Sequence, residues 1–265
     1  MMDKLIFGRY IPGDSLIHRL DPRAKLISAM AFIAIIFLAN NWITYAILSV
    51  FVYIALKLSE IKLSFFINGV KPLIWLILFT VLLQVLFTSG ATVLFRFGPI
   101  VVSREGLING VFIAMRFVLI IFISTLLTLT TMPLSLTDAI EFILKPFKAV
   151  NMPVHEIALM LSIALRFVPT LMDETEKIMN AQRARGIEFG EGNLYNQMKA
   201  IVPMLIPLFV SSFNRADELA TAMEARGYRG GEGRTKFRQL EWESRDTNVI
   251  ITFILLAVTL FIFRA

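Results

Sequence analysis

The chain has 265 residues, of which 57% are hydrophobic and only 17% are charged, and its mean hydropathy is +0.72. This balance excludes an ordinary soluble domain and indicates a helical membrane protein with several spans. Cysteine is absent, which excludes disulfides, thiolate nucleophiles and zinc–thiolate sites. The net charge of +6 is less informative than the positions of the charges along the chain.

The N-terminal segment is predicted to be structural. It lacks the basic flank and apolar core of a cleavable signal peptide. Residues 8–15 have the spacing of a phosphate-binding Walker A loop, but Asp14 occupies the lysine position and would repel phosphate, so we reject nucleotide binding. Asp21 and Pro22 are typical of an N-cap and a first-turn proline that begin a membrane helix, with Arg23 at the headgroups. The residues given this structural role are Asp14, Ser15, His18, Asp21, Pro22 and Arg23.

Five apolar segments are predicted to cross the membrane, since a helix needs roughly 20 apolar residues to do so. They cover residues 22–39, 42–58, 72–87, 106–129 and 248–263. Lysine and arginine concentrate before the first span, between the second and third, and between the fourth and fifth. The positive-inside rule therefore predicts a cytoplasmic N-terminus and an external C-terminus. Residues 92–103 alternate around Gly98-Pro99 and are expected to form a small external hairpin.

Charged and metal-binding residues are scarce inside the predicted spans. Arg116 is the one full charge expected deep within a span, as a functional group or as an anchor of the bundle. No Asp or Glu lies deep in any of the five spans, which argues against a proton-coupled secondary carrier. His18 and His155 are far apart and lack further ligands at metal-binding spacing, so no metal site is expected.

Residues 132–247 are expected to form cytoplasmic or interfacial helices. Two apolar runs within this segment, 155–172 and 200–213, are broken by proline, which is more typical of interfacial or packed helices than of spans. Pro169, Pro203 and Pro207 are expected to kink these helices and could act as hinges. A count of seven spans is the competing interpretation, which we expect to leave both arginine motifs and the C-terminus on unchanged sides.

An internal repeat with an offset of 41 positions relates Arg185 to Arg226. Each copy contains an apolar run, a charged amphipathic stretch and an Ala-Arg-Gly triplet: Ala184-Arg185-Gly186 and Ala225-Arg226-Gly227. The glycines are expected to end helices as left-handed C-caps. One arginine in a last turn would only complement the helix dipole. Two copies indicate a pair of cationic tips facing the cytoplasm, each able to bind a carboxylate through two hydrogen bonds.

Three signatures follow one another along the chain: the N-terminal GRYIPGDSLIHRLDPRAKL over residues 8–26, the stretch ALRFVPTLMDE over residues 164–174 and the two triplets. Together they resemble the transmembrane T component of energy-coupling factor vitamin transporters, over nearly the whole chain. The resemblance is closest to T components that are shared among several substrate-binding S components. It implies an all-α, polytopic protein of the bacterial plasma membrane, with about five transmembrane helices and long cytoplasmic coupling helices.

The resemblance also implies the partners. Arg185 and Arg226 would dock on two cytoplasmic ATPase subunits, and the coupling helices would hold a membrane S component. ATP and magnesium would be bound by the ATPases, with no cofactor, metal or nucleic acid bound by this chain. The expected organisation is an N-terminal elbow with four spans over 1–131, a coupling region over 132–247 and a last span over 248–265.

Three alternatives stay open. One is a T component dedicated to a cobalt, nickel or biotin system. A second is a stand-alone carrier or channel, which would transport without ATP when purified alone. A third is a membrane-embedded enzyme, for which no nucleophile, metal or acid–base group of residues can be assembled from this sequence.

Overall fold

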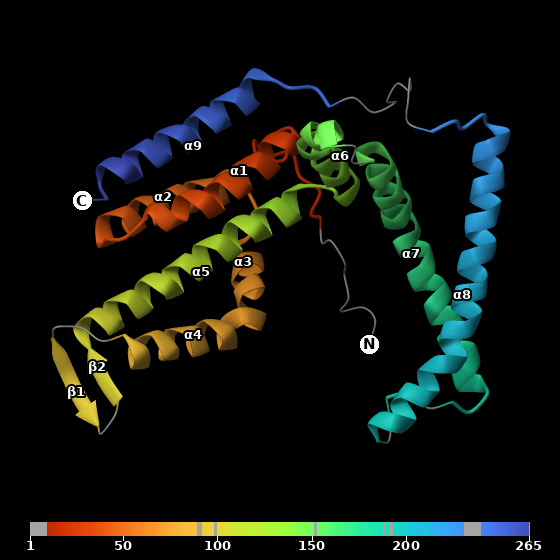
Figure 1. Cartoon of the computed structure of the whole chain (residues 1–265), viewed down its shortest axis with the longest axis horizontal. Coiled ribbons are helices and arrows are strands. Elements are labelled where there is room, and N and C mark those ends of the chain that lie inside the picture. The colour runs from red at the N-terminus through yellow and green to blue at the C-terminus, as the bar shows by residue number, and fades with distance from the viewer. Residues whose placement is uncertain are drawn as a thin grey trace. The chain divides into compact units, whose positions relative to one another are not determined.

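The computed structural model describes residues 10–88, 92–97, 100–150, 153–187, 189–190, 193–230 and 240–264. These residues form helices joined by short connections, with one two-stranded hairpin (Figure 1). The chain divides into two compact units: unit 1 is Met1–Ala139 with Leu240–Ala265, and unit 2 is Ile140–Gln239. The structure therefore has the predicted helical class.

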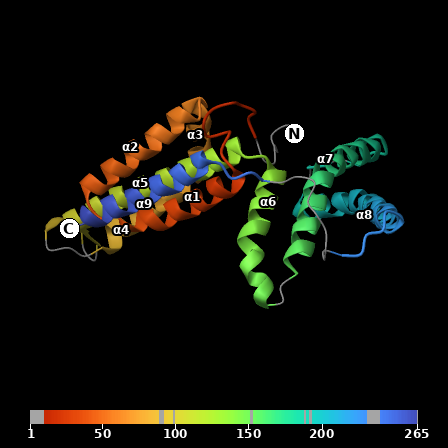
Figure 2. The same cartoon turned by 90° about the horizontal axis from the view of Figure 1, so that it is seen from above.

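Unit 1 is a helical bundle that contains most of the buried core. Its elements are α1 (Pro22–Ile35), η2 (Ile36–Leu38), α2 (Trp42–Leu58), α3 (Leu63–Val70), η3 (Lys71–Leu73), α4 (Ile74–Phe87), β1 (Val93–Phe97), β2 (Ile100–Ser103), α5 (Arg104–Thr130) and α9 (Ser244–Ile262). Helices α1, α2, α5 and α9 lie side by side (Figures 1 and 2). Phe32, Tyr45 and Leu48 are fully buried between them.

The first two helices begin where polar side chains cap them. The Asp21 carboxylate accepts a hydrogen bond from the backbone N–H of Arg23 at 2.7 Å, and Pro22 occupies the first turn of α1. Asn41 and Thr44 form a reciprocal capping box at the start of α2. These caps satisfy N–H groups that have no intrahelical partner. The predicted boundary between the first two spans is thus confirmed.

The third predicted span corresponds to η3 and α4, but the helix that precedes it was missed. Residues 63–70 already form α3, and Figure 1 shows α3 turned away from α4 at the position of η3. Pro72 lies in η3 and lacks a backbone N–H donor, which explains the interruption. Beyond α4, β1 and β2 pair antiparallel from Val93 opposite Ser103 to Phe97 opposite Ile100, so the expected hairpin is confirmed.

The bundle of unit 1 has two ends that hydrogen bonds define. At the first end, which we call the elbow face, the Asp21 N–H donates to Asp246 of α9 at 2.8 Å, and the Ile11 N–H donates to the Leu129 carbonyl of α5 at 2.9 Å. At the opposite face, Asn40 and Asn41 donate to backbone carbonyls at the end of α9, both at 2.7 Å. Helices α1 and α9 therefore run parallel, and α5 runs against them.

Four helical stretches are long and apolar enough to cross a membrane: Leu63–Phe87, Arg104–Thr130, Val154–Ala184 and Ser244–Ile262. Helix α2 is a shorter apolar helix of 17 residues, and α1 has 14 residues. The stretch Val154–Ala184 was predicted to be interfacial. Its length and composition also allow it to cross a membrane, as the competing count of seven spans requires.

Unit 2 is dominated by two long antiparallel helices, α7 (Val154–Ala184) and α8 (Leu194–Ala225) (Figure 1). The chain enters it through α6 (Pro133–Leu144) and η4 (Lys145–Val150). Pro169 lies inside α7, and Pro203 and Pro207 lie inside α8. Each proline removes one backbone donor, but both helices continue through them.

Candidate docking site on α7 and α8

The first Ala-Arg-Gly triplet ends α7 in a two-bond C-cap. The Ile187 N–H donates to the Gln182 carbonyl at 3.1 Å, and the Gly186 N–H donates to the Arg183 carbonyl at 2.9 Å. Gly186 has a φ of 86°, which lies in the left-handed region. This arrangement is the Schellman motif, which satisfies carbonyls that a helix end leaves without partners.

The second triplet repeats this cap at the end of α8. The Tyr228 N–H donates to the Met223 carbonyl at 3.0 Å, and the Gly227 N–H donates to the Glu224 carbonyl at 2.9 Å. Gly227 has a φ of 72°. A Cβ atom on Gly186 or Gly227 would meet nothing within 4 Å, so backbone conformation and not space requires the glycines. The predicted left-handed caps are confirmed at both positions.

Both arginines are presented to the surface. Arg185 and Arg226 are exposed, as are the alanine before and the glycine after each of them. Within the described part of the chain, neither guanidinium takes part in a hydrogen bond or an ion pair. The two forks of N–H donors are therefore available to a partner.

Helices α7 and α8 are joined by a polar contact that sequence analysis missed. Glu174 of α7 accepts hydrogen bonds from the Ser211 hydroxyl and from Arg215 of α8, the latter at 3.2 Å. The Arg215 guanidinium also lies 5.7 Å from the centre of the Phe167 ring, within the range of cation–π attraction. A signal existed in the repeat, because Glu174 and Arg215 occupy matched positions with opposite charges.

The two arginine tips lie at equal distances along their helices from the Glu174–Arg215 contact. Glu174 lies 11 positions before Arg185, and Arg215 lies 11 positions before Arg226. With a helical rise of about 1.5 Å per residue, each tip is roughly 16 Å from the contact. Because the helices are antiparallel, the tips extend in opposite directions and lie at most roughly 33 Å apart along the helix axes.

A second contact uses a carbonyl that a proline sets free. Pro207 has no N–H, so the carbonyl of Pro203, four residues earlier, loses its usual intrahelical donor. The side-chain amide of Gln182 donates to this carbonyl at 3.2 Å. Gln182 is buried and lies three residues before Arg185. Its hydrogen bond to the free carbonyl of α8 therefore attaches the C-terminal end of α7 to α8.

The antiparallel arrangement corrects one expectation. We expected a seven-span topology to leave both arginine motifs on the same side. Helix α7 is continuous up to Ala184, so an α7 that crossed the bilayer would carry Arg185 to the side opposite its own start. A topology in which α7 and α8 both cross the bilayer would therefore put the two motifs on opposite sides of it.

Helix α8 carries a broad apolar face that the pairing with α7 leaves uncovered. Its exposed members recur every three or four residues: Met198, Ile201, Val202, Leu205, Ile206, Phe209, Val210 and Phe213. A contiguous exposed surface of this kind marks a lipid or protein contact. The same helix thus combines an apolar side with a cationic end.

The residues of the N-terminal signature are engaged in local contacts in unit 1. The His18 ring lies between the Ser15 hydroxyl, 2.6 Å from Nδ1, and the Ile11 carbonyl, 3.0 Å from Nε2. A Cβ atom on Gly13 would lie 2.9 Å from this ring, so only glycine fits there without displacing it. Asp14 is exposed in the adjoining turn.

Asp21 and Arg23 belong to a network that connects α1 with α9. Their side chains form an ion pair at 2.9 Å, and Arg23 also donates to the Leu240 carbonyl at 2.9 Å. Asp246, which is 2% exposed, accepts from the backbone N–H groups of Asp21 and Glu243, both at 2.8 Å. Sequence analysis did not identify Asp246, because its partner lies 225 positions earlier in the chain.

Arg116 reaches from the middle of α5 towards the end of the first helix. Its guanidinium lies 3.5 Å from the Ala39 carbonyl and 5.0 Å from the centre of the Phe37 ring. Its Nε atom is buried without a hydrogen-bond partner among the described residues. The charge therefore sits beside the turn before α2, where a long side chain can reach polar surroundings.

His155 lies apart from His18, as the separation in sequence suggested. Its Nδ1 atom is 3.7 Å from the carboxylate of Glu141 in unit 2. In the described ranges, the structure shows no group of three histidine, aspartate or glutamate side chains that could hold a metal ion.

The fold and this pair of capped helices define a multi-pass membrane protein. Comparisons with known proteins identify which one. A family model described as "CbiQ: Cobalt transport protein" matches residues 13–237. The energy-coupling factor transporter transmembrane protein EcfT 1 of Listeria monocytogenes is 61% identical over 100% of this chain and 99% of its own. EcfT of Lacticaseibacillus paracasei is 65% identical over 92% of this chain and 93% of its own, and EcfT of Bacillus subtilis is 55% identical over both complete chains.

The chain therefore belongs to the EcfT family of energy-coupling factor transporter transmembrane proteins. The resemblance inferred from the triplets and the N-terminal signature is confirmed. The protein is a membrane component of a transporter.

Proposed function

We propose that this chain is the scaffold that couples two cytoplasmic ATPase subunits to micronutrient uptake through a membrane S component. The observation that carries the proposal is the repeated cationic cap. Arg185 and Arg226 are exposed in matching C-caps, at equal distances from the Glu174–Arg215 contact and on opposite arms. Two equivalent tips suit two related partner subunits.

In this proposal each guanidinium binds a carboxylate in a groove of one ATPase. When ATP brings the ATPases together, the two tips approach each other and the angle between α7 and α8 changes. The Glu174–Arg215 contact lies midway between the tips, so it serves as the pivot. Pro169, Pro203 and Pro207 are the positions where bending requires the fewest backbone hydrogen bonds to break. ATP and magnesium belong to the ATPases, and this chain contributes no catalytic group.

The same proposal assigns the sides of the membrane. Helices α7 and α8 lie along the cytoplasmic surface, and the apolar face of α8 contacts the S component. Four basic residues gather toward the elbow face of unit 1, which by the positive-inside rule supports a cytoplasmic N-terminus: Arg19, Arg23, Lys25 and Lys57. In this orientation, the parallel course of α1 and α9 supports an external C-terminus.

The docking role is tested with Arg185→Glu combined with Arg226→Glu. Truncating one partner of a buried charge pair costs about 2 to 5 kcal/mol, so the loss of two anchors removes about 4 kcal/mol or more, roughly a thousandfold in affinity. We expect both ATPases to be lost from the complex purified in mild detergent, while the variant stays monodisperse.

A matched control is Lys177→Glu with Lys199→Glu, which makes the same charge change at exposed positions of the same two helices. We expect this control to retain both ATPases. Undiminished co-purification of the ATPases with the arginine variant would overturn the docking role.

The description of the matched family as a cobalt transport protein supports a dedicated metal-ion system as a second candidate. Uptake by cells that express the complex, measured with labelled vitamins and with labelled cobalt, separates the two. ATP-independent uptake by the purified chain alone would instead indicate a stand-alone carrier.

A further inference from the structure

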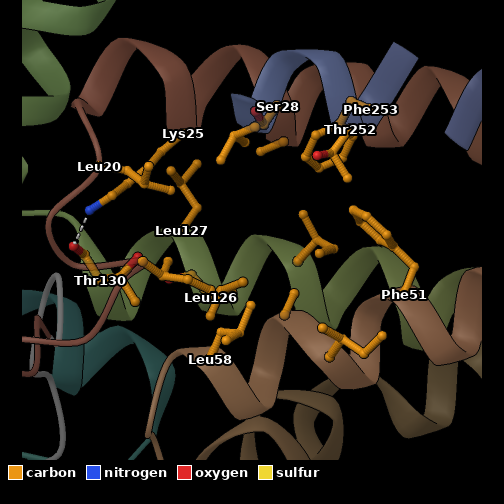
Figure 3. A pocket seen from close by; sticks show the side chains of 16 residues that line it. Leu20, Lys25, Ser28, Phe51, Leu58, Leu126, Leu127, Thr130, Thr252 and Phe253 are labelled. Atoms are coloured by element: carbon orange, nitrogen blue, oxygen red, sulfur yellow. Dashed lines mark hydrogen bonds between the residues drawn. The ribbon is translucent and has the colours of Figure 1, made fainter. Parts of the chain in front are cut away.

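Unit 1 contains a cavity of about 240 Å³ bounded by α1, α2, α5 and α9 (Figure 3). Its wall is apolar apart from Lys25 and the hydroxyl groups of Ser28, Thr130 and Thr252. Protein interiors are normally packed as densely as organic crystals, and an apolar cavity of about 150 Å³ is already large enough to bind benzene. This cavity therefore has room for a segment of an apolar ligand.

The cavity has a closed end and an open side. Phe51 and Phe253 meet edge to face at 5.1 Å and close the end that lies away from Lys25 (Figure 3). Ile54 and Leu58 of α2 line the cavity and are also 52% and 44% exposed, so the cavity opens sideways past these two residues. In a membrane-spanning bundle, an apolar side opening faces the acyl chains of the bilayer.

The other end of the cavity carries a buried cation. Lys25 is 7% exposed, and its ammonium group donates to the His18 carbonyl at 3.0 Å and to the Thr130 carbonyl at 2.9 Å (Figure 3). An ammonium group has three hydrogens, and the described residues accept only two of them. Lys57, exposed in the last turn of α2 beside Leu58, brings a second positive charge to the helix ends around this site.

One polar group of the wall lacks a partner. The Ser28 hydroxyl is buried and makes no hydrogen bond within the described structure. Ser28 follows Lys25 by three residues, so the two side chains share one face of α1, with Ser28 roughly 4.5 Å deeper along the helix. A ligand that carries one oxygen near Lys25 and another one turn deeper would satisfy both groups.

We propose that this cavity binds one acyl chain of an anionic phospholipid. The lipid phosphate receives the third hydrogen bond of Lys25, an ester carbonyl accepts from the Ser28 hydroxyl, and the chain extends towards Phe51 and Phe253. At this end Lys25, Lys57 and Arg23 outnumber the carboxylates of Asp21 and Asp246, and this excess of positive charge favours a headgroup with a net negative charge. This site is independent of the arginine tips in unit 2.

The test uses the full-length chain, stripped of lipid in mild detergent and titrated with dioleoylphosphatidylglycerol or dioleoylphosphatidylcholine in native mass spectrometry. Ala55→Phe places a ring in the cavity, whereas Ala46→Phe adds the same ring to an exposed position of α2 outside it. We expect one phosphatidylglycerol to bind to the wild type and to Ala46→Phe at least tenfold more tightly than to Ala55→Phe. Equal affinity in all three proteins would overturn the proposal.

The headgroup is tested separately. Wild-type protein should prefer phosphatidylglycerol over phosphatidylcholine severalfold, and Lys25→Met should abolish the preference. Because Lys25 also supports two backbone carbonyls, Lys57→Met provides an exposed charge change that leaves those hydrogen bonds intact and should reduce the preference. Equal binding of the two lipids to the wild type would overturn the assignment of an anionic headgroup.

A photoactivatable phosphatidylglycerol with a diazirine in its acyl chain gives a readout that needs no variant. We expect crosslinks concentrated on the cavity-lining segments of α1, α2, α5 and α9. Crosslinks that instead spread evenly over the exposed apolar face of α4 would contradict a defined site.

Discussion

The two units of this protein are stabilised in different ways. Unit 1 has a continuous apolar core with fully buried residues such as Phe32, Tyr45 and Leu260, and the hydrogen bond from Asp21 to Asp246 is buried as well. In unit 2, the Glu174 and Arg215 side chains of the main polar contact are 24% and 35% exposed, and α8 leaves a long apolar face uncovered. Both units expose apolar surface, but unit 1 has a packed interior of its own, whereas unit 2 is held together by few contacts.

This difference suits the proposed coupling role. A packed bundle in the membrane resists deformation, whereas a helix pair held by few contacts can change its crossing angle at a small cost in free energy. Three sets of substitutions are designed to break or sharpen the comparison.

The largest effect is expected in unit 1 from Asp246→Ala. This change leaves the buried N–H of Asp21 and the partly buried N–H of Glu243 without an acceptor, which costs about 3 kcal/mol at 1 to 3 kcal/mol for each group. We expect the melting temperature in detergent to fall by several degrees. Asp217→Ala, at an exposed position of α8, serves as the control and should change stability by less than about 0.5 kcal/mol. Equal melting temperatures for the two variants would show that the buried network does not stabilise unit 1.

A smaller effect is expected at the triplets from Gly186→Ala and Gly227→Ala. A left-handed conformation costs a residue with a Cβ atom about 1 to 2 kcal/mol, so each helix end should fray and its arginine should lose its fixed position. We expect binding of the ATPases to weaken about tenfold for each variant, as measured by surface plasmon resonance with the chain in nanodiscs.

Gly190→Ala is the matched control for the two glycine variants. Gly190 has a φ of 89° and open space around it, but it does not follow a triplet arginine. We expect this variant to bind the ATPases as the wild type does. A loss equal to that of Gly186→Ala would show that the strain acts through general destabilisation and not through the arginine tips.

The smallest effect on stability is expected at the contact between α7 and α8. Because the Glu174–Arg215 pair is partly exposed, a double-mutant cycle of Glu174→Gln and Arg215→Gln should give a coupling free energy of about 0.5 to 1 kcal/mol. Transport should suffer more than stability, with ATP hydrolysis continuing while uptake falls. Unchanged uptake per ATP hydrolysed would contradict the role of this contact as a pivot.

Local signals in the sequence predicted the parts of the fold that depend on neighbouring residues. The caps at Asp21, Asn41, Gly186 and Gly227 follow from residue types that favour one backbone conformation, and the structure has a helix boundary at each. The short helix α3 was missed because Pro72 was taken as the first start signal of that span. The chain's apolar composition and its repeated triplets were enough to indicate the family, which the comparisons confirm.

The sequence alone thus determined the helical membrane class, most helix boundaries and the two exposed arginines, because composition, capping and the 41-residue repeat are local properties. Only the tertiary structure decided which residues meet across long separations. It joined Asp21 to Asp246 and Glu174 to Arg215, and it enclosed a cavity beside Lys25. It also showed that α7 and α8 are antiparallel, so that the two tips extend in opposite directions. These features depend on how helices pack, and periodicity along one helix does not specify its neighbours.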